Sequence, residues 1–159
     1  MKDNLFGDRK LFILYALAAG ANIFNFAGHG GWAVYGNPSF VGLVTNSLKY
    51  ALGISMPDAT ALSLVKFIGS VDLIIALTMT LAFFGVWTGR GAFARLAKSR
   101  VMLLLFAWAV FWGLATAFSR VTAHNFETVY ILDFIERGGN YFGAAIALYL
   151  TTLLRRKRT

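Results

Sequence analysis

Four long apolar segments constrain this chain more than any other feature of its sequence. They cover residues 11–28, 62–87, 101–118 and 129–154. Since about 20 residues at 1.5 Å per residue cover the roughly 30 Å of a bilayer's hydrocarbon core, each is a candidate membrane span. Hydrophobic residues make up 58% of the 159 residues and charged residues only 14%, unlike a soluble domain. We therefore predict an all-α membrane protein, with residues 1–159 as a single domain built as a four-helix bundle.

The basic residues predict how the bundle is oriented. Eleven of them flank one side of the segments, whereas the connections on the other side hold only Lys49 and Arg120. The eleven are Lys2, Arg9, Lys10, Arg90, Arg95, Lys98, Arg100, Arg155, Arg156, Lys157 and Arg158. Because basic residues favour cytoplasmic loops, we expect both termini to be cytoplasmic, in a bacterial-type inner membrane. Membrane topology thus explains the net charge of +8, and we expect no nucleic acid as a partner.

The connection between the first two segments, residues 30–61, is too long for a tight turn and too apolar for an exposed loop. Asn37 and Pro38 suit the cap and the first turn of a helix. The residues that follow place their apolar side chains on one face. We predict an amphipathic helix over residues 39–52 that lies on or dips into the outer leaflet and covers the mouth of the bundle.

The fourth segment carries a polar cluster inside an apolar helix. Asp133 and Arg137 are four residues apart, and so are Glu136 and Asn140, which places all four on neighbouring parts of one face. A charge at the bilayer centre costs from about 3 to more than 10 kcal/mol, so this face should turn into the bundle. Two interpretations are open. Either Asp133 and Arg137 pair and only fix the helix, or the carboxylates have a function beside a gap that the Gly138–Gly139 pair leaves for a flat ligand.

The second segment contains two ionisable side chains at different depths. Lys66 lies about 6 Å and Asp72 about 15 Å along the segment, so only the lysine can reach the interface. We expect one ion pair between Lys66 and Asp133, and a second that joins Arg137 to Asp72 or Glu136. One carboxylate is then left for proton handling. We expect these groups to meet in a shared, water-poor pocket towards the non-cytoplasmic side.

The first segment ends in a polar stripe. Asn22, Asn25 and His29 fall on one helical face, and interhelical hydrogen bonds of about 0.6 kcal/mol are the simplest role for the asparagines. His29 lies among glycines at the membrane boundary, where an imidazole can exchange protons near neutral pH. The candidate proton-handling residues are therefore Glu136, Asp72 and His29. The candidate binding residues are Asn25, Lys66, Asp133, Arg137, Gly138, Gly139 and Asn140.

Several classes of protein are excluded by what the sequence does not contain. The chain has no cysteine, which excludes disulfides, iron–sulfur clusters and thiolate zinc sites. The only histidine besides His29 is His124, in a short outer loop, so a bis-histidine haem within the bundle is excluded. The aromatic residues of the third segment are interpreted as a lipid-facing or packing surface. We predict no metal and no intrinsic cofactor, although a quinone, lipid or pigment could lie against the bundle surface.

Several short motifs are similar to those of a known group of membrane proteins. They are His29-Gly30, Gly69-Ser70-Val71-Asp72, the turn Phe84-Gly85-Val86-Trp87-Thr88-Gly89-Arg90, and Glu136 with Asn140. In these motifs the chain resembles the DoxX-like family of small four-span membrane proteins. The family often has glutamate where this chain has Asp72, and the outer loop here is long. The resemblance implies a redox neighbourhood, because members are linked to thiosulfate:quinone oxidoreductase subunits and to membrane redox complexes.

Two functional hypotheses follow. In the first, the protein is a quinone-facing subunit of a membrane redox complex, and Glu136, Asp72 or His29 supplies protons. In the second, it is a non-catalytic accessory subunit that packs against a larger respiratory or photosynthetic assembly, and its internal charges only lock its own bundle. Both predict membrane lipids and other membrane subunits as partners, and neither predicts a soluble substrate. A transporter is disfavoured, because no inverted repeat is visible.

Overall fold

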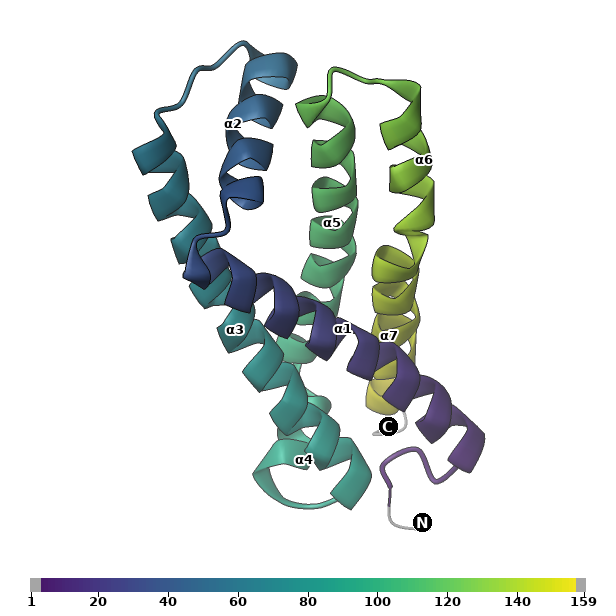
Figure 1. The fold of residues 1–159 in the computed structure, drawn as a ribbon. Helices are drawn as coiled ribbons and strands as arrows, with labels where there is room; N and C mark the ends of the chain where they lie inside the picture. Colours follow the sequence, from purple (N-terminus) through teal and green to yellow (C-terminus); the bar gives the residue numbers. More distant parts are fainter. Residues whose placement is uncertain (1–3, 157–159) are drawn as a thin grey trace.

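The computed structural model describes residues 4–156, which form seven α-helices and no strand (Figure 1). The helices are α1 (Arg9–Tyr35), α2 (Pro38–Leu52), α3 (Asp58–Thr88), α4 (Gly91–Ala97), α5 (Arg100–Ala123), α6 (Thr128–Glu136) and α7 (Gly138–Arg156). α1, α3 and α5 are long and apolar enough to cross a membrane. The predicted all-α class is confirmed, and the three long helices are those expected of a membrane protein.

The three long helices extend beyond their predicted segments. The Asp8 carboxylate accepts hydrogen bonds from the backbone N–H groups of Lys10 and Leu11, which caps the start of α1. Gly36, with a φ of +84°, ends the same helix in the left-handed conformation that glycine adopts most easily. The prediction followed hydropathy alone, whereas each helix continues past the ends of its most apolar stretch.

The predicted amphipathic helix is confirmed as α2, but its place in the bundle differs. The Asn37 side chain accepts a hydrogen bond from the N–H of Ser39 at 2.9 Å, and Pro38 occupies the first turn. α2 stands beside α3 and α5 and forms part of the bundle wall instead of covering its mouth (Figure 1). One contact that holds it there is a hydrogen bond of 2.7 Å from the Ser47 hydroxyl to the carbonyl oxygen of Ser119 in α5.

The fourth apolar segment is broken, and the prediction of one continuous helix over residues 129–154 is wrong. α6 ends at Glu136, and α7 begins at Gly138. Between them, the N–H of Asn140 donates to the carbonyl oxygen of Arg137 at 2.9 Å, a three-residue spacing that tightens the turn. The two successive glycines each weaken a helix by about 1 kcal/mol relative to alanine, which explains where the break falls.

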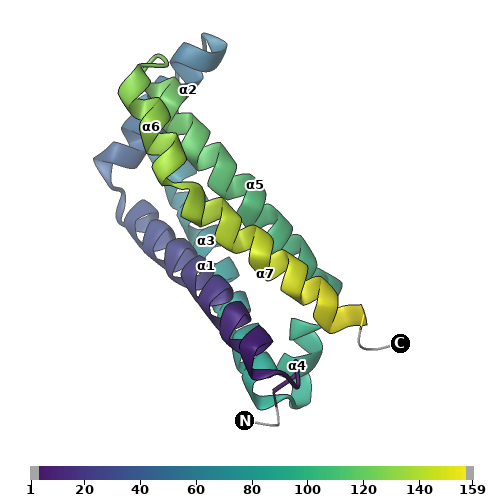
Figure 2. The ribbon, with the colours of Figure 1, turned by 90° about the vertical axis from the view of Figure 1, so that its right-hand side faces the viewer.

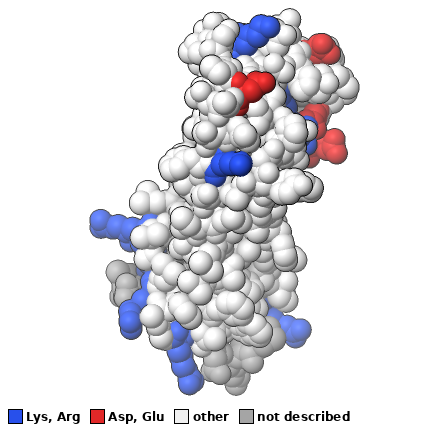
Figure 3. Space-filling model, turned by 60° about the vertical axis from the view of Figure 1, so that its left-hand side comes forward, with Lys and Arg blue, Asp and Glu red and all other residues white. Residues whose placement is uncertain are grey.

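The helices divide the molecule into two halves along its long axis (Figures 1 and 2). α3 and α5 run through both halves. α1, α7 and the short α4 complete the half that also holds both ends of the described chain, which we call the basic half. α2 and α6 complete the other, which we call the α2/α6 half. On the face seen in Figure 3, an uncharged belt separates basic side chains at one end from acidic and basic side chains together at the other.

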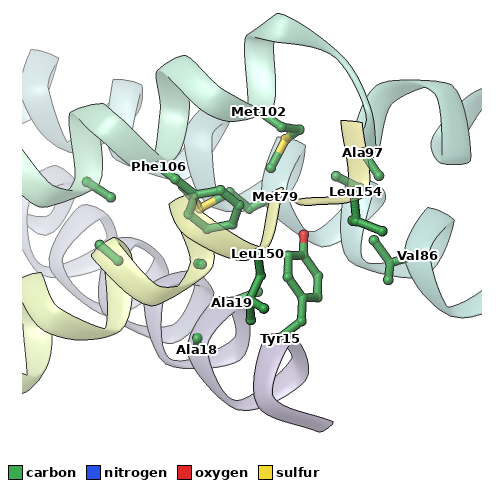
Figure 4. Close-up of a cluster of buried hydrophobic side chains, with 14 of the residues drawn as sticks. Tyr15, Ala18, Ala19, Met79, Val86, Ala97, Met102, Phe106, Leu150 and Leu154 are labelled. Atoms are coloured by element: carbon green, nitrogen blue, oxygen red, sulfur yellow. The ribbon is translucent and has the colours of Figure 1, made fainter. Parts of the chain in front are cut away.

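The basic half has a closely packed core. Tyr15, Met79, Phe106 and Leu150 come from α1, α3, α5 and α7, and none is more than 1% exposed. Their side chains point towards one another (Figure 4). The Tyr15 hydroxyl is hydrogen-bonded to the side chain of Thr151, so the one polar group on these four side chains has a partner. Four helices thus meet in this half and fill it.

Candidate functional site

A cavity of about 330 Å³ lies in the α2/α6 half. α2, α3 and α5 form most of its wall, and its apolar lining includes Phe40, Leu43, Val44 and Ile68. The polar side chains that line it are His29, Ser47, Asp72, Trp112, Thr116, Ser119, Arg120 and Arg137. A mostly apolar cavity of this size with a few polar groups is typical of a site for a small ligand.

The cavity exists because helix packing changes between the two halves. In the basic half α1 packs against both α3 and α7, and α5 packs against α7. In the α2/α6 half, α2 packs against α3 and α5, whereas α6 packs mainly against α5. The residues that line the cavity come from α1, α2, α3 and α5, with Arg137 from the turn after α6, so α6 itself does not close this space.

A close crossing of α1 and α3 positions the inner end of this cavity, which we call the floor. A Cβ atom added to Gly30 would lie 2.8 Å from the carbonyl oxygen of Gly69. A Cβ on Gly69 would lie equally close to the Gly30 carbonyl oxygen, so only glycines allow the two backbones to approach in this way. The crossing places His29 on α1 and Asp72 on α3 beside the cavity.

Asp72 is the acid at the floor. It is 4% exposed, and its hydrogen-bond partner is the side chain of Trp112 in α5. Trp112 in turn stacks on Trp108, with ring centroids 5.4 Å and ring planes 14° apart. The partner of Asp72 is therefore an indole N–H and not a base, and the predicted pair between Arg137 and Asp72 is not formed.

His29 lines the same cavity from α1. Its imidazole packs edge-on against Phe40 of α2, with ring centroids 5.9 Å apart and ring planes at 73°. Among residues 4–156 no side chain hydrogen-bonds to this imidazole. Its ring nitrogens are therefore available to a ligand in the cavity.

Arg120, Asp133 and Arg137 form an ion-pair cluster at the opening of the cavity, which we call the mouth cluster. Arg120 Nη1 lies 3.3 Å from Asp133 Oδ2, and Arg137 Nε lies 3.2 Å from both Asp133 oxygens. The pairing of Asp133 with Arg137 is therefore observed. The predicted pair between Lys66 and Asp133 is wrong, because α6 packs on α5 and not on α3. Lys66 is exposed and lies beside Gly36, at the end of α1.

Glu136, the first candidate for proton handling, is placed outside the cavity. It is exposed at the end of α6 and makes no ion pair among the described residues. The predicted pair between Arg137 and Glu136 is therefore also wrong. The expected shared pocket brings together Asp72, His29 and Arg137 but not Glu136, which lies on α6 with its side chain exposed.

The remaining candidates also lie outside the cavity lining. Asn25 and Asn140 are half-buried. Gly138 faces the rings of Phe142 and Tyr141, so it does not leave a gap for a ligand. Gly139 faces open space.

Asn22, on α1, forms a hydrogen bond within its own helix. The Asn22 amide donates to the carbonyl oxygen of Ala18 at 2.8 Å, instead of to another helix. Its predicted interhelical hydrogen bond is therefore not formed.

Sequence reasoning missed the contribution of α5. Trp112, Thr116 and Arg120 all line the cavity, and they are spaced four residues apart. That spacing places them on one face of a helix and could have been recognised as a polar stripe. The aromatic residues around them directed the prediction towards a lipid-facing surface.

No group of His, Asp or Glu residues suited to hold a metal ion occurs in the part of the chain that the structure describes. Comparison of the chain with protein-family models, with curated protein sequences and with solved structures finds no match.

Proposed function

We propose that this protein is a small integral membrane subunit of a redox complex and that its cavity takes up a lipid-soluble quinone. The observation that carries the proposal is the composition of the cavity. An apolar wall accommodates a ring and the start of an apolar tail, and an acid and an imidazole stand at one end of it. The resemblance to the DoxX-like family points to the same chemistry.

The floor is where the quinone ring would be held. Reduction of a quinone to a quinol takes two electrons and two protons, and the electrons would come from a redox cofactor of a partner subunit. Asp72 and His29 would each deliver one proton, so that each quinone oxygen gains one, because both line the cavity and the imidazole has no hydrogen-bond partner among the described residues. Trp112 would hold the Asp72 carboxyl in a fixed orientation.

The proposal also assigns the protein's place in the membrane. α1, α3 and α5 would each cross the bilayer, and α6 and α7 together would make a fourth crossing. The basic half would face the cytoplasm with both termini, because basic residues are retained on that side. The cavity would then lie towards the outer leaflet of a bacterial-type inner membrane, where a quinone is dissolved.

A second candidate is the accessory subunit, which the mouth cluster favours. Asp133 pairs with Arg137 within one segment and with Arg120 of the neighbouring helix, as expected if internal charges lock the bundle. Large apolar side chains such as Phe24, Phe67 and Phe142 are more than 60% exposed and would contact lipid or another subunit. Loss of complex assembly on deletion, with turnover unchanged in the complex that still forms, would support this candidate.

Quinone content tests the first candidate. The full chain is purified from its membrane with a mild detergent, and extracted quinone is counted per protein. We expect wild-type protein to retain quinone, and Asp72→Asn to retain several-fold less because the carboxyl lines the site. Glu136→Gln serves as the matched control and should retain as much as wild type, since Glu136 lies outside the cavity. Equal quinone content in all three proteins would contradict the proposal.

A further inference from the structure

The mouth cluster carries more positive than negative charge. Two guanidinium groups share the single carboxylate of Asp133. Arg137 uses only its Nε atom for this contact, and Arg120 uses only Nη1. A guanidinium has five N–H donors, so most of the donors on both side chains have no partner among the described residues.

These free donors are accessible. The side chains of Arg120 and Arg137 are 38% and 29% exposed, and both line the cavity. No side-chain nitrogen of the described residues is buried without a partner, so the free N–H groups open onto the cavity or its surroundings. At the level of a membrane, where water is scarce, a guanidinium with free donors needs acceptor oxygens from another source.

No other acid in the cavity neutralises the cluster. Asp72 is bonded to Trp112, which is eight residues and about 12 Å along α5 from Arg120. Glu136 lies between Asp133 and Arg137 in the sequence but is exposed and forms no ion pair within residues 4–156. The mouth therefore keeps an excess of one positive charge beside a set of free donors.

The surroundings of the cluster are strongly apolar. On α6, which carries Asp133, the side chains of Val129, Leu132 and Ile135 are 62%, 61% and 64% exposed. These side chains, on the same helix as Asp133, need an apolar covering, whereas the two arginines need an oxyanion. One molecule supplies both when it has an acidic head and hydrocarbon chains.

We propose that the mouth cluster binds the phosphate of an anionic phospholipid from the surrounding leaflet. The phosphate oxygens accept hydrogen bonds from the free N–H groups of Arg120 and Arg137, since the planar guanidinium fork matches phosphate geometry. The acyl chains stay in the bilayer and cover the exposed apolar side chains of α6. This lipid site goes beyond the proposed quinone site, because it uses the mouth of the cavity and not its floor.

Lipid binding to the full chain in detergent tests the proposal. Phosphatidylglycerol, phosphatidylcholine or inorganic phosphate is added as the probe, and bound molecules are counted by native mass spectrometry. We expect wild-type protein to bind phosphatidylglycerol about tenfold more tightly than phosphatidylcholine, and Arg120→Gln with Arg137→Gln to remove that preference. Lys66→Gln is the matched control. It removes an exposed base of the same half that lies outside the cavity, and it should leave the preference unchanged.

Three results would overturn the proposal. The first is an unchanged preference in the double arginine variant, and the second is an equal loss in Lys66→Gln. The third is displacement of the lipid by millimolar inorganic phosphate, which would assign the cluster to free phosphate. Asp133→Asn gives a further test if the arginine variants do not fold, because it frees both guanidinium groups and should tighten phosphatidylglycerol binding. Weaker binding by that variant would also contradict the proposal.

These experiments distinguish failure of the lipid proposal from failure of the quinone proposal. Asp72→Asn is expected to lose quinone and to keep phosphatidylglycerol. Loss of the lipid preference in the arginine variants would therefore stand even if no quinone is found in the wild-type protein.

Discussion

The two halves of this molecule share α3 and α5 but differ in what completes the bundle. In the basic half α1 and α7 bring large side chains such as Tyr15 and Leu150 into one filled core. In the α2/α6 half the shorter helices pack against α5 from separate directions and leave a cavity of about 330 Å³. Two breaks in the chain, at Gly36 after α1 and at Arg137 before α7, separate the helices of the basic half from α2 and α6.

The largest effect is expected where the two halves meet, at the crossing of α1 and α3. Gly30→Leu would place a Cβ 2.8 Å from a backbone oxygen of α3, so we expect a loss of at least about 3 kcal/mol in the free energy of unfolding. Gly31→Leu is the adjacent control, because a Cβ there meets nothing within 4 Å and should change stability by less than about 0.5 kcal/mol. Thermal unfolding in detergent measures both. Similar losses would mean that the crossing does not hold the halves together.

Truncation of one leucine in each half sharpens the comparison. Leu150→Ala empties space in a core where the side chain is 1% exposed, and should cost about 3 kcal/mol. Leu43→Ala only enlarges an existing cavity and should cost less than about 1 kcal/mol, because its side chain already borders open space. Chemical denaturation measures both losses in the free energy of unfolding. A larger loss for Leu43→Ala than for Leu150→Ala would show that protein side chains fill the cavity.

A larger side chain should destabilise the basic half but not the α2/α6 half. Ala109 is 3% exposed in the core, and Ala109→Phe should cost about 2 kcal/mol through overpacking. Ala115 lines the cavity, so Ala115→Phe should leave the unfolding temperature nearly unchanged and remove bound quinone. Quinone counting together with thermal unfolding separates the two outcomes. Full quinone content in a stable Ala115→Phe protein would place the ligand elsewhere.

The smallest effect is expected at Glu136. Its side chain is exposed and unpaired in the described structure, so Glu136→Gln should change the free energy of unfolding by less than about 0.5 kcal/mol. Asp133→Asn gives the contrast one turn away, since it removes the carboxylate that two arginines share and should cost more. A larger loss in Glu136→Gln than in Asp133→Asn would contradict the observed pairing.

Hydropathy predicted the helices more successfully than their packing. The first three apolar segments were found as helices, and Asn37-Pro38 correctly predicted the start of α2, because caps and apolar runs are local features. The break at Arg137 was not predicted, because a Gly-Gly pair within an apolar run is tolerated in many membrane helices. The break divides the predicted fourth helix into α6 and α7.

The sequence predicted some residues of the candidate site but not their partners. Asp72 was recognised because a charged residue deep in an apolar helix needs an internal partner, and His29 because it lies among glycines at the membrane boundary. Both line the cavity. Their neighbours could not be assigned from spacing, because the pairing depends on which helices touch. The partner of Asp72 is Trp112, an aromatic residue, and the partner of Asp133 from another helix is Arg120, which the prediction had placed in an outer connection.

One measurement tests the central claim that the α2/α6 half is open to a ligand and the basic half is closed. The chain has no cysteine, so single cysteines can be introduced and labelled cleanly. Thr116 and Thr151 both bond to a carbonyl oxygen four residues earlier at 2.8 Å, but Thr116 lines the cavity and Thr151 is fully buried in the core. We predict that Thr116→Cys reacts with a small methanethiosulfonate reagent and is protected by added quinone, whereas Thr151→Cys does not react. Equal reactivity at both positions, or an unreactive Thr116→Cys, would contradict the account.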